Sequence, residues 1–166
     1  MPKRIHKIQG ISLGTASSNT RYGRKEDSLL VTLPEESVIS GKFTSNKLKA
    51  APVKLAVENL SNSKKAKKVL LINAGNANAA TGPKGLKDVR KYCKEIALDF
   101  KISQENVIPF STGVIGEPLA TENYLSAFRE ASKGLSENKW NKAAEAILTT
   151  DTKPNIISKE VKVGKT

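Results

Sequence analysis

Short apolar runs that alternate with amphipathic helical segments are the feature that most restricts the fold of this chain. The runs are bounded by Gly, Pro, Asn or charged residues, and they predict strands at 28–33, 38–44, 69–73 and 107–111. Strands and helices mixed in this order indicate an α/β or mixed α+β fold, with a sheet flanked by helices. The pattern leaves open whether the strands run parallel or antiparallel.

Four segments have apolar residues at helical spacing, which predicts four helices with one buried face each. Pro52 suits the first turn of the first helix, and Thr121 is a suitable N-cap for the third. The apolar faces are Val53, Ala56, Val57 and Leu60; Val89, Tyr92, Cys93, Ile96, Ala97 and Phe100; Tyr124, Leu125, Phe128 and Ala131; and Trp140, Ala143, Ala144 and Ile147.

The charged, alternating segment 158–166 predicts a further strand that stops without a cap or a turn. We therefore expect the polypeptide to continue beyond it. The length of 166 residues suits a single domain, 1–166.

The net charge of +12 invites a nucleic-acid interpretation, but its distribution disfavours one. Lysines are scattered along the chain, and the densest run, 64–68, has no aromatic residue interleaved to stack on bases. We expect no nucleic-acid partner. Excess positive charge also fits one half of an assembly whose other half is acidic, or an enzyme with anionic substrates.

The basic N-terminus leads into Gln9, Gly10 and Ser12 instead of the apolar core of a signal peptide, so we expect a cytoplasmic protein without a membrane partner. Cys93 is the single cysteine, which excludes an internal disulfide, and its place on an apolar helix face favours a core residue over a nucleophile. The sole histidine, His6, lacks a triad pattern. No residue pattern suggests a metal, a nucleotide or another cofactor.

Three strings of small and polar residues stand at the ends of predicted elements. The first, 73–82, would form a tight turn whose amides bind an anion or a carboxylate, although its composition favours a structural turn with left-handed Asn residues. In the second, 111–118, a Thr hydroxyl beside a Gly amide could serve as oxyanion donors, and a plain β-to-α loop is equally compatible. The third, 149–152, places three hydroxyls around a carboxylate and favours a helix-to-strand connection over a substrate site.

Taken in order, these strings resemble the ornithine acetyltransferase (glutamate N-acetyltransferase) family along nearly the whole chain. The segments that match its motifs are 10–14 with 23–27, 41–46 with 50–53, 73–82, 111–118 and 144–152. Small departures occur at Ala74, Ala80 and Asn155. One such string would be weak evidence, but five in register are specific.

The resemblance implies a precursor that cuts itself into an α chain and a β chain, whose new N-terminal threonine is the nucleophile. Thr112 and Gly113 match the oxyanion hole, and Thr149 matches a substrate-binding threonine. The nucleophilic Thr would lie outside 1–166, so this α-chain part would be inactive alone. The resemblance further implies acetyl transfer from N-acetylornithine to glutamate in arginine biosynthesis, without a cofactor, by an α2β2 assembly. The resemblance does not decide whether acetyl-CoA also serves as an acetyl donor. The alternative is a catalytically inactive binding or scaffold module on the same fold.

Overall fold

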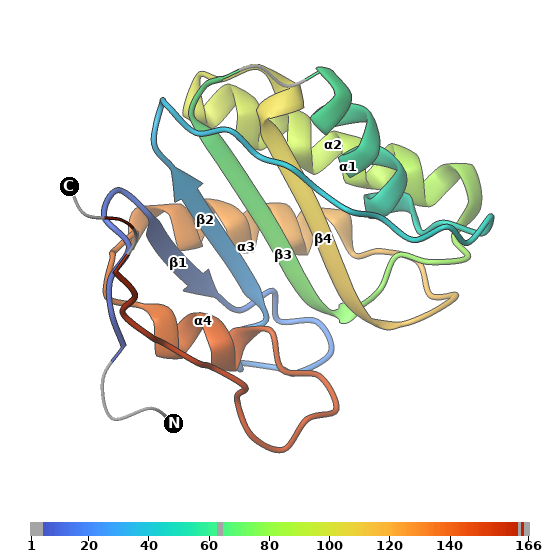
Figure 1. The fold of residues 1–166 in the computed structure, drawn as a ribbon. Coiled ribbons are helices and arrows are strands. Elements are labelled where there is room, and N and C mark those ends of the chain that lie inside the picture. Colours follow the sequence, from blue (N-terminus) through green and yellow to red (C-terminus); the bar gives the residue numbers. More distant parts are fainter. Residues whose placement is uncertain (1–4, 63–64, 163, 165–166) are drawn as a thin grey trace.

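A computed structural model describes residues 5–62, 65–162 and 164. One sheet has helices on both of its faces, which confirms the expected α/β architecture (Figure 1). In chain order the elements are β1 (Ser12–Ala16), β2 (Ser28–Leu33), α1 (Ala51–Asn62), β3 (Lys68–Asn76), α2 (Gly82–Phe100), the 3-10 turn η1 (Gln104–Asn106), β4 (Val107–Val114), α3 (Thr121–Lys133) and α4 (Trp140–Ala146).

The strands are ordered β1-β2-β3-β4. Antiparallel pairing joins β1 to β2 and β2 to β3, whereas β3 and β4 are parallel. A parallel pair needs a crossover connection, and α2 provides it. Because β3 and β4 run in the same direction, their carboxyl ends lie at the same edge of the sheet, where the first two polar strings are found.

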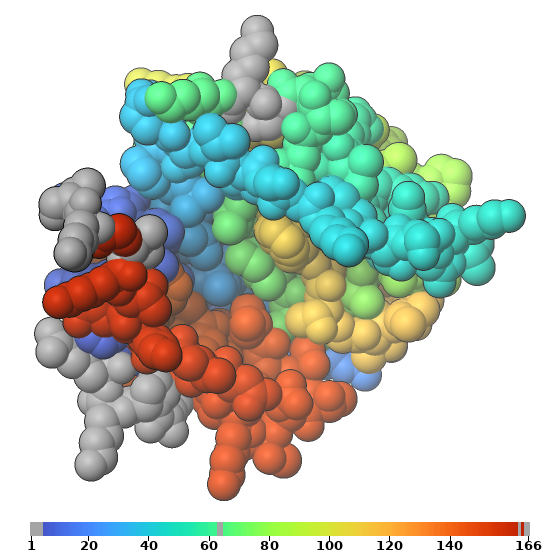
Figure 2. Space-filling view, viewed as in Figure 1, coloured from blue at the N-terminus to red at the C-terminus, as the bar shows by residue number. Residues whose placement is uncertain are grey.

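The two faces of the sheet bury alternate residues of each strand. Leu30 of β2 belongs to the main core between the sheet and α1, α2 and α3, where the rings of Tyr92 and Phe128 lie 5.4 Å apart. Leu29 and Val31 point to the other face and pack with residues of α4. Figure 2 shows this second face, with atoms of β2, β3 and β4 visible between the segment around residues 34–48 and α4.

The apolar faces predicted for α2 and α3 are confirmed, and Cys93 is buried in the core. The face of α1 is turned relative to the prediction, since Leu55 and Asn59 are buried while Val57 is 36% exposed. Asn59 explains the difference, because its side-chain amide donates to the carbonyl of Val107 at 2.7 Å. Apolar periodicity cannot indicate a buried amide that binds a neighbouring backbone.

Two predicted strands are wrong. Segment 38–44 is extended and exposed, with Val38 at 79%, and pairs with no strand in the described part of the chain. Both edges of the preceding strand, β2, are already occupied by β1 and β3, so the segment has no ladder to join there. Residues 158–162 also form no strand. The remainder of that prediction, apart from Gly164, lies outside the described residues.

The strand β1 was not predicted, because its sequence SLGTA is not an apolar run. Gly14 in its centre is required by packing: a Cβ atom there would lie 2.0 Å from the backbone oxygen of Ala131 in α3. The expected cap at Thr121 is also wrong. Thr121 is the first residue of α3, and its hydroxyl donates backward to the carbonyl of Leu119 at 3.3 Å.

Candidate functional site at the ends of β3 and β4

Thr112 and Gly113 lie inside β4. The predicted strand ended at residue 111, which would have placed both residues in the loop that follows it. The strand is longer than predicted because β3 also continues through Asn76, and the two remain paired to their ends. In this register Ala74 is opposite Thr112, and Gly75 is opposite Gly113. The first two polar strings of the sequence therefore meet at one place.

Gly75 and Gly113 adopt backbone conformations that L side chains rarely take, with φ of +105° and +132°. A Cβ atom on Gly113 would lie 2.3 Å from the carbonyl carbon of Gly75 and 2.6 Å from the nitrogen of Asn76. The two backbones approach too closely for any side chain between them. Since β4 is the last strand in the order and Gly113 is exposed, its backbone remains accessible to a ligand.

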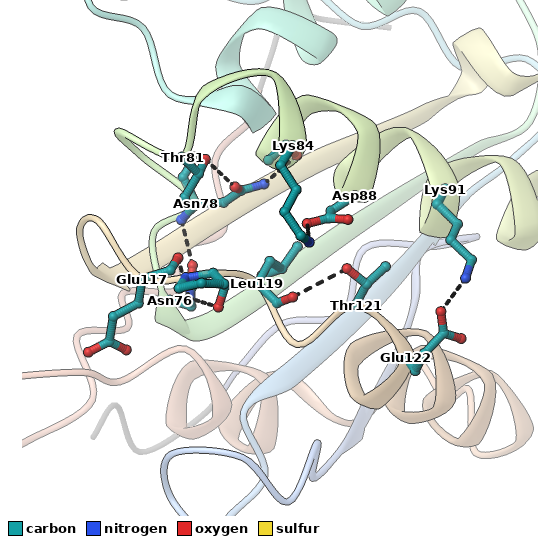
Figure 3. Close-up of polar contacts among 12 residues, drawn as sticks. Asn76, Asn78, Thr81, Lys84, Asp88, Lys91, Glu117, Leu119, Thr121 and Glu122 are labelled. Atoms are coloured by element: carbon teal, nitrogen blue, oxygen red, sulfur yellow. Dashed lines mark hydrogen bonds and ion pairs between the residues drawn. The ribbon is translucent and has the colours of Figure 1, made fainter.

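Asn76 and Asn78 hold the loop after β4 against the start of α2 (Figure 3). The side-chain amide of Asn76 donates to the carbonyls of Glu117 and Pro118 at 3.2 and 3.1 Å, and its oxygen accepts from the backbone N–H of Asn78 at 2.7 Å. The amide of Asn78 donates to the carbonyl of Gly85 at 3.0 Å. Asn78 has a φ of 45°, so this part of the string is a structural turn with a left-handed Asn.

The strand ends are also joined through side chains. The hydroxyl of Ser111 donates to Oδ1 of Asn73 at 2.6 Å, and Nδ2 of Asn73 donates to the carbonyl of Asn76 at 2.7 Å. Asn73 is fully buried, so its amide groups need these partners. The positive-φ backbone at Gly75 is thus fixed from within the sheet.

A cavity of about 230 Å³ adjoins Gly75, and the ion pair between Arg21 and Glu117, with Nη1 and Oε2 3.0 Å apart, lies at its wall. The ring of Tyr22 lies 3.1 Å from the position of a Cβ atom on Gly75. Sequence reasoning missed this contribution from the β1–β2 connection. The run of hydroxyl and amide residues at 17–20 was the available signal, because such residues favour turns.

Thr149 lies in a bend after α4, half-buried, and no hydrogen bond joins it to Thr112 or Gly113 among the described residues. Its connection to the site is indirect. The carbonyl of Leu148 accepts from Nζ of Lys25 at 3.2 Å, and that ammonium group lies 5.0 Å from the centre of the Tyr22 ring. In Figure 1 the loop after α4 passes near the end of the sheet where β3 and β4 finish.

Other candidate groups lie elsewhere. The backbone N–H of His6 donates to Oγ of Ser158 at 2.8 Å, in the terminal arms. Burial raises the pKa of the Cys93 thiol, which keeps it protonated and unreactive.

Within 5–62, 65–162 and 164, no three His, Cys, Asp or Glu side chains gather as metal ligands. In the same ranges, no helix has the length and apolar character needed to cross a membrane.

The model of the ArgJ family matches residues 12–166. The "Arginine biosynthesis bifunctional protein ArgJ" of Methylococcus capsulatus is 41% identical over 161 residues, which cover 97% of this chain and 39% of that protein. This chain spans about two fifths of the length of the curated relatives it matches.

Two solved structures are similar. Ornithine acetyltransferase from Mycobacterium tuberculosis, complexed with ornithine, has a TM-score of 0.79 and 26% identity, over 87% of this chain and 78% of the other. The arginine biosynthesis bifunctional protein from Bacillus halodurans has a TM-score of 0.74 and 29% identity, over 90% and 81%. Sequence and fold agree along nearly the whole chain, and the chain therefore belongs to the ArgJ family.

Proposed function

We propose that this chain is the α-chain part of a glutamate N-acetyltransferase of arginine biosynthesis, which transfers an acetyl group from N-acetylornithine to glutamate through an acyl-threonine. The single observation that carries the proposal is the Thr112–Gly113 pair on the last strand of the sheet, with an exposed glycine at a φ of +132°. Acyl transfer needs hydrogen-bond donors that are fixed in advance at an accessible site, and the exposure of Gly113 on a paired strand supports this role for the pair.

The names of the relatives support the choice of reaction. The curated relatives are named for arginine biosynthesis, and one similar solved structure is an ornithine acetyltransferase that holds ornithine. The word "bifunctional" in the relatives' names supports a second acetyl donor, for which acetyl-CoA is the candidate. We place Thr149 at the substrate, from the family motif alone.

The reaction then follows from the chemistry of a threonine nucleophile supplied by a β chain. Its α-amine, with a pKa of about 8, takes the hydroxyl proton while the oxygen attacks the acetyl carbon of N-acetylornithine. The tetrahedral oxyanion accepts hydrogen bonds from Thr112 and Gly113. The amide bond breaks, the proton passes to the leaving amine, and ornithine departs.

The second half of the reaction reverses these steps with another amine. The neutral amino group of glutamate attacks the acyl-threonine ester, and a second oxyanion forms at the same donors. Loss of a proton to the α-amine and cleavage of the ester release N-acetylglutamate and restore the threonine hydroxyl. The same donors serve self-cleavage, which also passes through a tetrahedral oxyanion. The working enzyme is a cytoplasmic α2β2 assembly.

The test is Thr112→Ala in the full-length protein that contains this chain. We expect kcat to fall about 10²- to 10³-fold, with a smaller change in KM, because one oxyanion donor is lost. Self-cleavage should slow as well. Thr112→Ser is the matched control, since it retains the hydroxyl and should keep most of the activity. An unchanged kcat in Thr112→Ala would leave Thr112 as a structural residue of β4 and overturn the proposal.

A further inference from the structure

Tyr124 of α3 is buried, with 1% of its surface exposed, and its hydroxyl reaches the strand that faces the candidate oxyanion donors. The phenol donates to the carbonyl of Ala74 at 3.0 Å. From the other side, the backbone N–H of Ala74 donates to the carbonyl of Asp27 at 2.8 Å. The Ala74 residue is therefore held between α3 and the start of β2.

Ala74 occupies a critical position, because it lies opposite Thr112 and immediately precedes Gly75. A displacement of Ala74 would move the backbone of Gly75, which is bonded to it. Since a Cβ atom on Gly113 would lie 2.3 Å from the carbonyl carbon of Gly75, the two backbones are in close contact. A movement of Gly75 is therefore passed on to Gly113.

Behind Tyr124, a row of hydroxyl groups ends at the buried carboxylate of Asp27. The hydroxyl of Thr20 lies 3.4 Å from that of Tyr124 and 2.7 Å from that of Ser18, which donates to Oδ2 of Asp27 at 2.5 Å. The carbonyl of Ala74 can only accept, so the hydrogen of its contact with Tyr124 comes from the phenol, whichever way the hydroxyls of Thr20 and Ser18 point.

The hydrogen of Tyr124 is thus available for Ala74. Burial raises the pKa of the Tyr124 hydroxyl, and the nearby Asp27 carboxylate adds to the effect, although hydrogen bonds from Thr20 and other neighbours oppose it. The phenol therefore stays protonated at neutral pH and remains a donor.

We propose that Tyr124 is a positioning residue for the oxyanion donors: by holding Ala74, its hydroxyl fixes the backbone of Gly75, against which Gly113 is placed. This inference rests on the proposed function of Thr112 and Gly113. It assigns no contact between Tyr124 and a substrate. Its role is to keep the donors at the distance that the oxyanion requires.

The test compares two tyrosines of the same core in the full-length protein. Tyr124→Phe keeps the ring and removes the hydrogen bond to Ala74. We expect kcat per folded molecule to fall about 10- to 100-fold, with KM changed much less, because a misplaced donor loses stabilisation of the transition state. Tyr92→Phe is the control, since the Tyr92 hydroxyl is buried near Ser111 without a hydrogen bond of normal geometry. Its kcat should stay close to that of the parent protein.

A double variant distinguishes positioning from a general structural role. If Tyr124 acts through the donors, adding Tyr124→Phe to Thr112→Ala should lower kcat by clearly less than it does alone. Full multiplication of the two effects, or a Tyr124→Phe enzyme that matches Tyr92→Phe, would overturn the inference and leave the proposed function intact. Normal activity in Thr112→Ala would instead overturn the proposed function itself.

Discussion

Lys68 donates a hydrogen bond from Nζ to Oδ1 of Asn106 at 2.8 Å, with both side chains buried. The pair joins the amino ends of β3 and β4, at the opposite end of these strands from the candidate site. Burial lowers the pKa of Lys68, and the negative charge of Glu105 partly opposes the shift. Among the described residues, β3 and β4 are the one parallel strand pair, and a side-chain hydrogen bond joins them near each end.

The lowered pKa of Lys68 predicts a pH dependence of stability. Between that pKa and the ordinary value of 10.5, the unfolded chain holds a proton that the folded chain has released. The free energy of unfolding should therefore rise with pH in this window. Urea midpoints measured at several alkaline pH values should show a smaller rise for Lys68→Met than for the parent protein. Lys94→Met, at an exposed position of α2, is the control and should keep the parent slope. Equal slopes in all three proteins would contradict the prediction.

Gly113→Ala should lower the free energy of unfolding by about 2–5 kcal/mol, since it adds backbone strain and overlap with the neighbouring strand. Gly116→Ala is the matched control three residues later. Gly116 also has a positive φ, +85°, but a Cβ atom there meets nothing within 4 Å, so only strain of about 1 kcal/mol is expected. Chemical denaturation of both variants measures the difference. Similar losses of unfolding free energy in the two variants would mean that the close contact between Gly113 and Gly75 does not add to the cost of a side chain.

Residues 1–166 produced alone should transfer no acetyl group from N-acetylornithine to glutamate, because the proposed nucleophile lies outside them. Co-expression with the remaining sequence of the full-length protein should restore the transfer. Product formation followed by mass spectrometry is the measurement. Turnover by the isolated chain would show that a group within these residues acts as the nucleophile.

Periodicity predicted the long helices well, because α2 and α3 bury the apolar stripes that the sequence displays. It ended both β3 and β4 three residues too early, since Gly75, Asn76 and Gly113 are poor strand formers. Here the pairing of the two strands outweighs local preference. The short strand β1 escaped detection for a similar reason, as its central glycine is selected by contact with α3.

The candidate donors Thr112 and Gly113 could be named from the sequence, but their surroundings could not. Tyr124 fits the apolar face of its helix, and nothing in the spacing shows that its hydroxyl would bind Ala74, 50 residues earlier in the chain. Asp27 likewise lies in a charged string that suggests exposure, yet it is buried with Ser18 and Ser28 as donors. A contact such as that of Tyr124 with Ala74 is set by topology, and topology is what a single sequence specifies least directly.

The crossover that makes β3 and β4 parallel also affects when the site forms during folding. Loop-closure entropy favours early pairing of the antiparallel strands β1 and β2, whose connection is short, and later pairing of β3 and β4, which α2 separates along the chain. Contacts that close long loops form slowly. A molecule in which β3 and β4 have not yet paired lacks the apposed glycines, so under the proposed function it would carry out neither acetyl transfer nor self-cleavage.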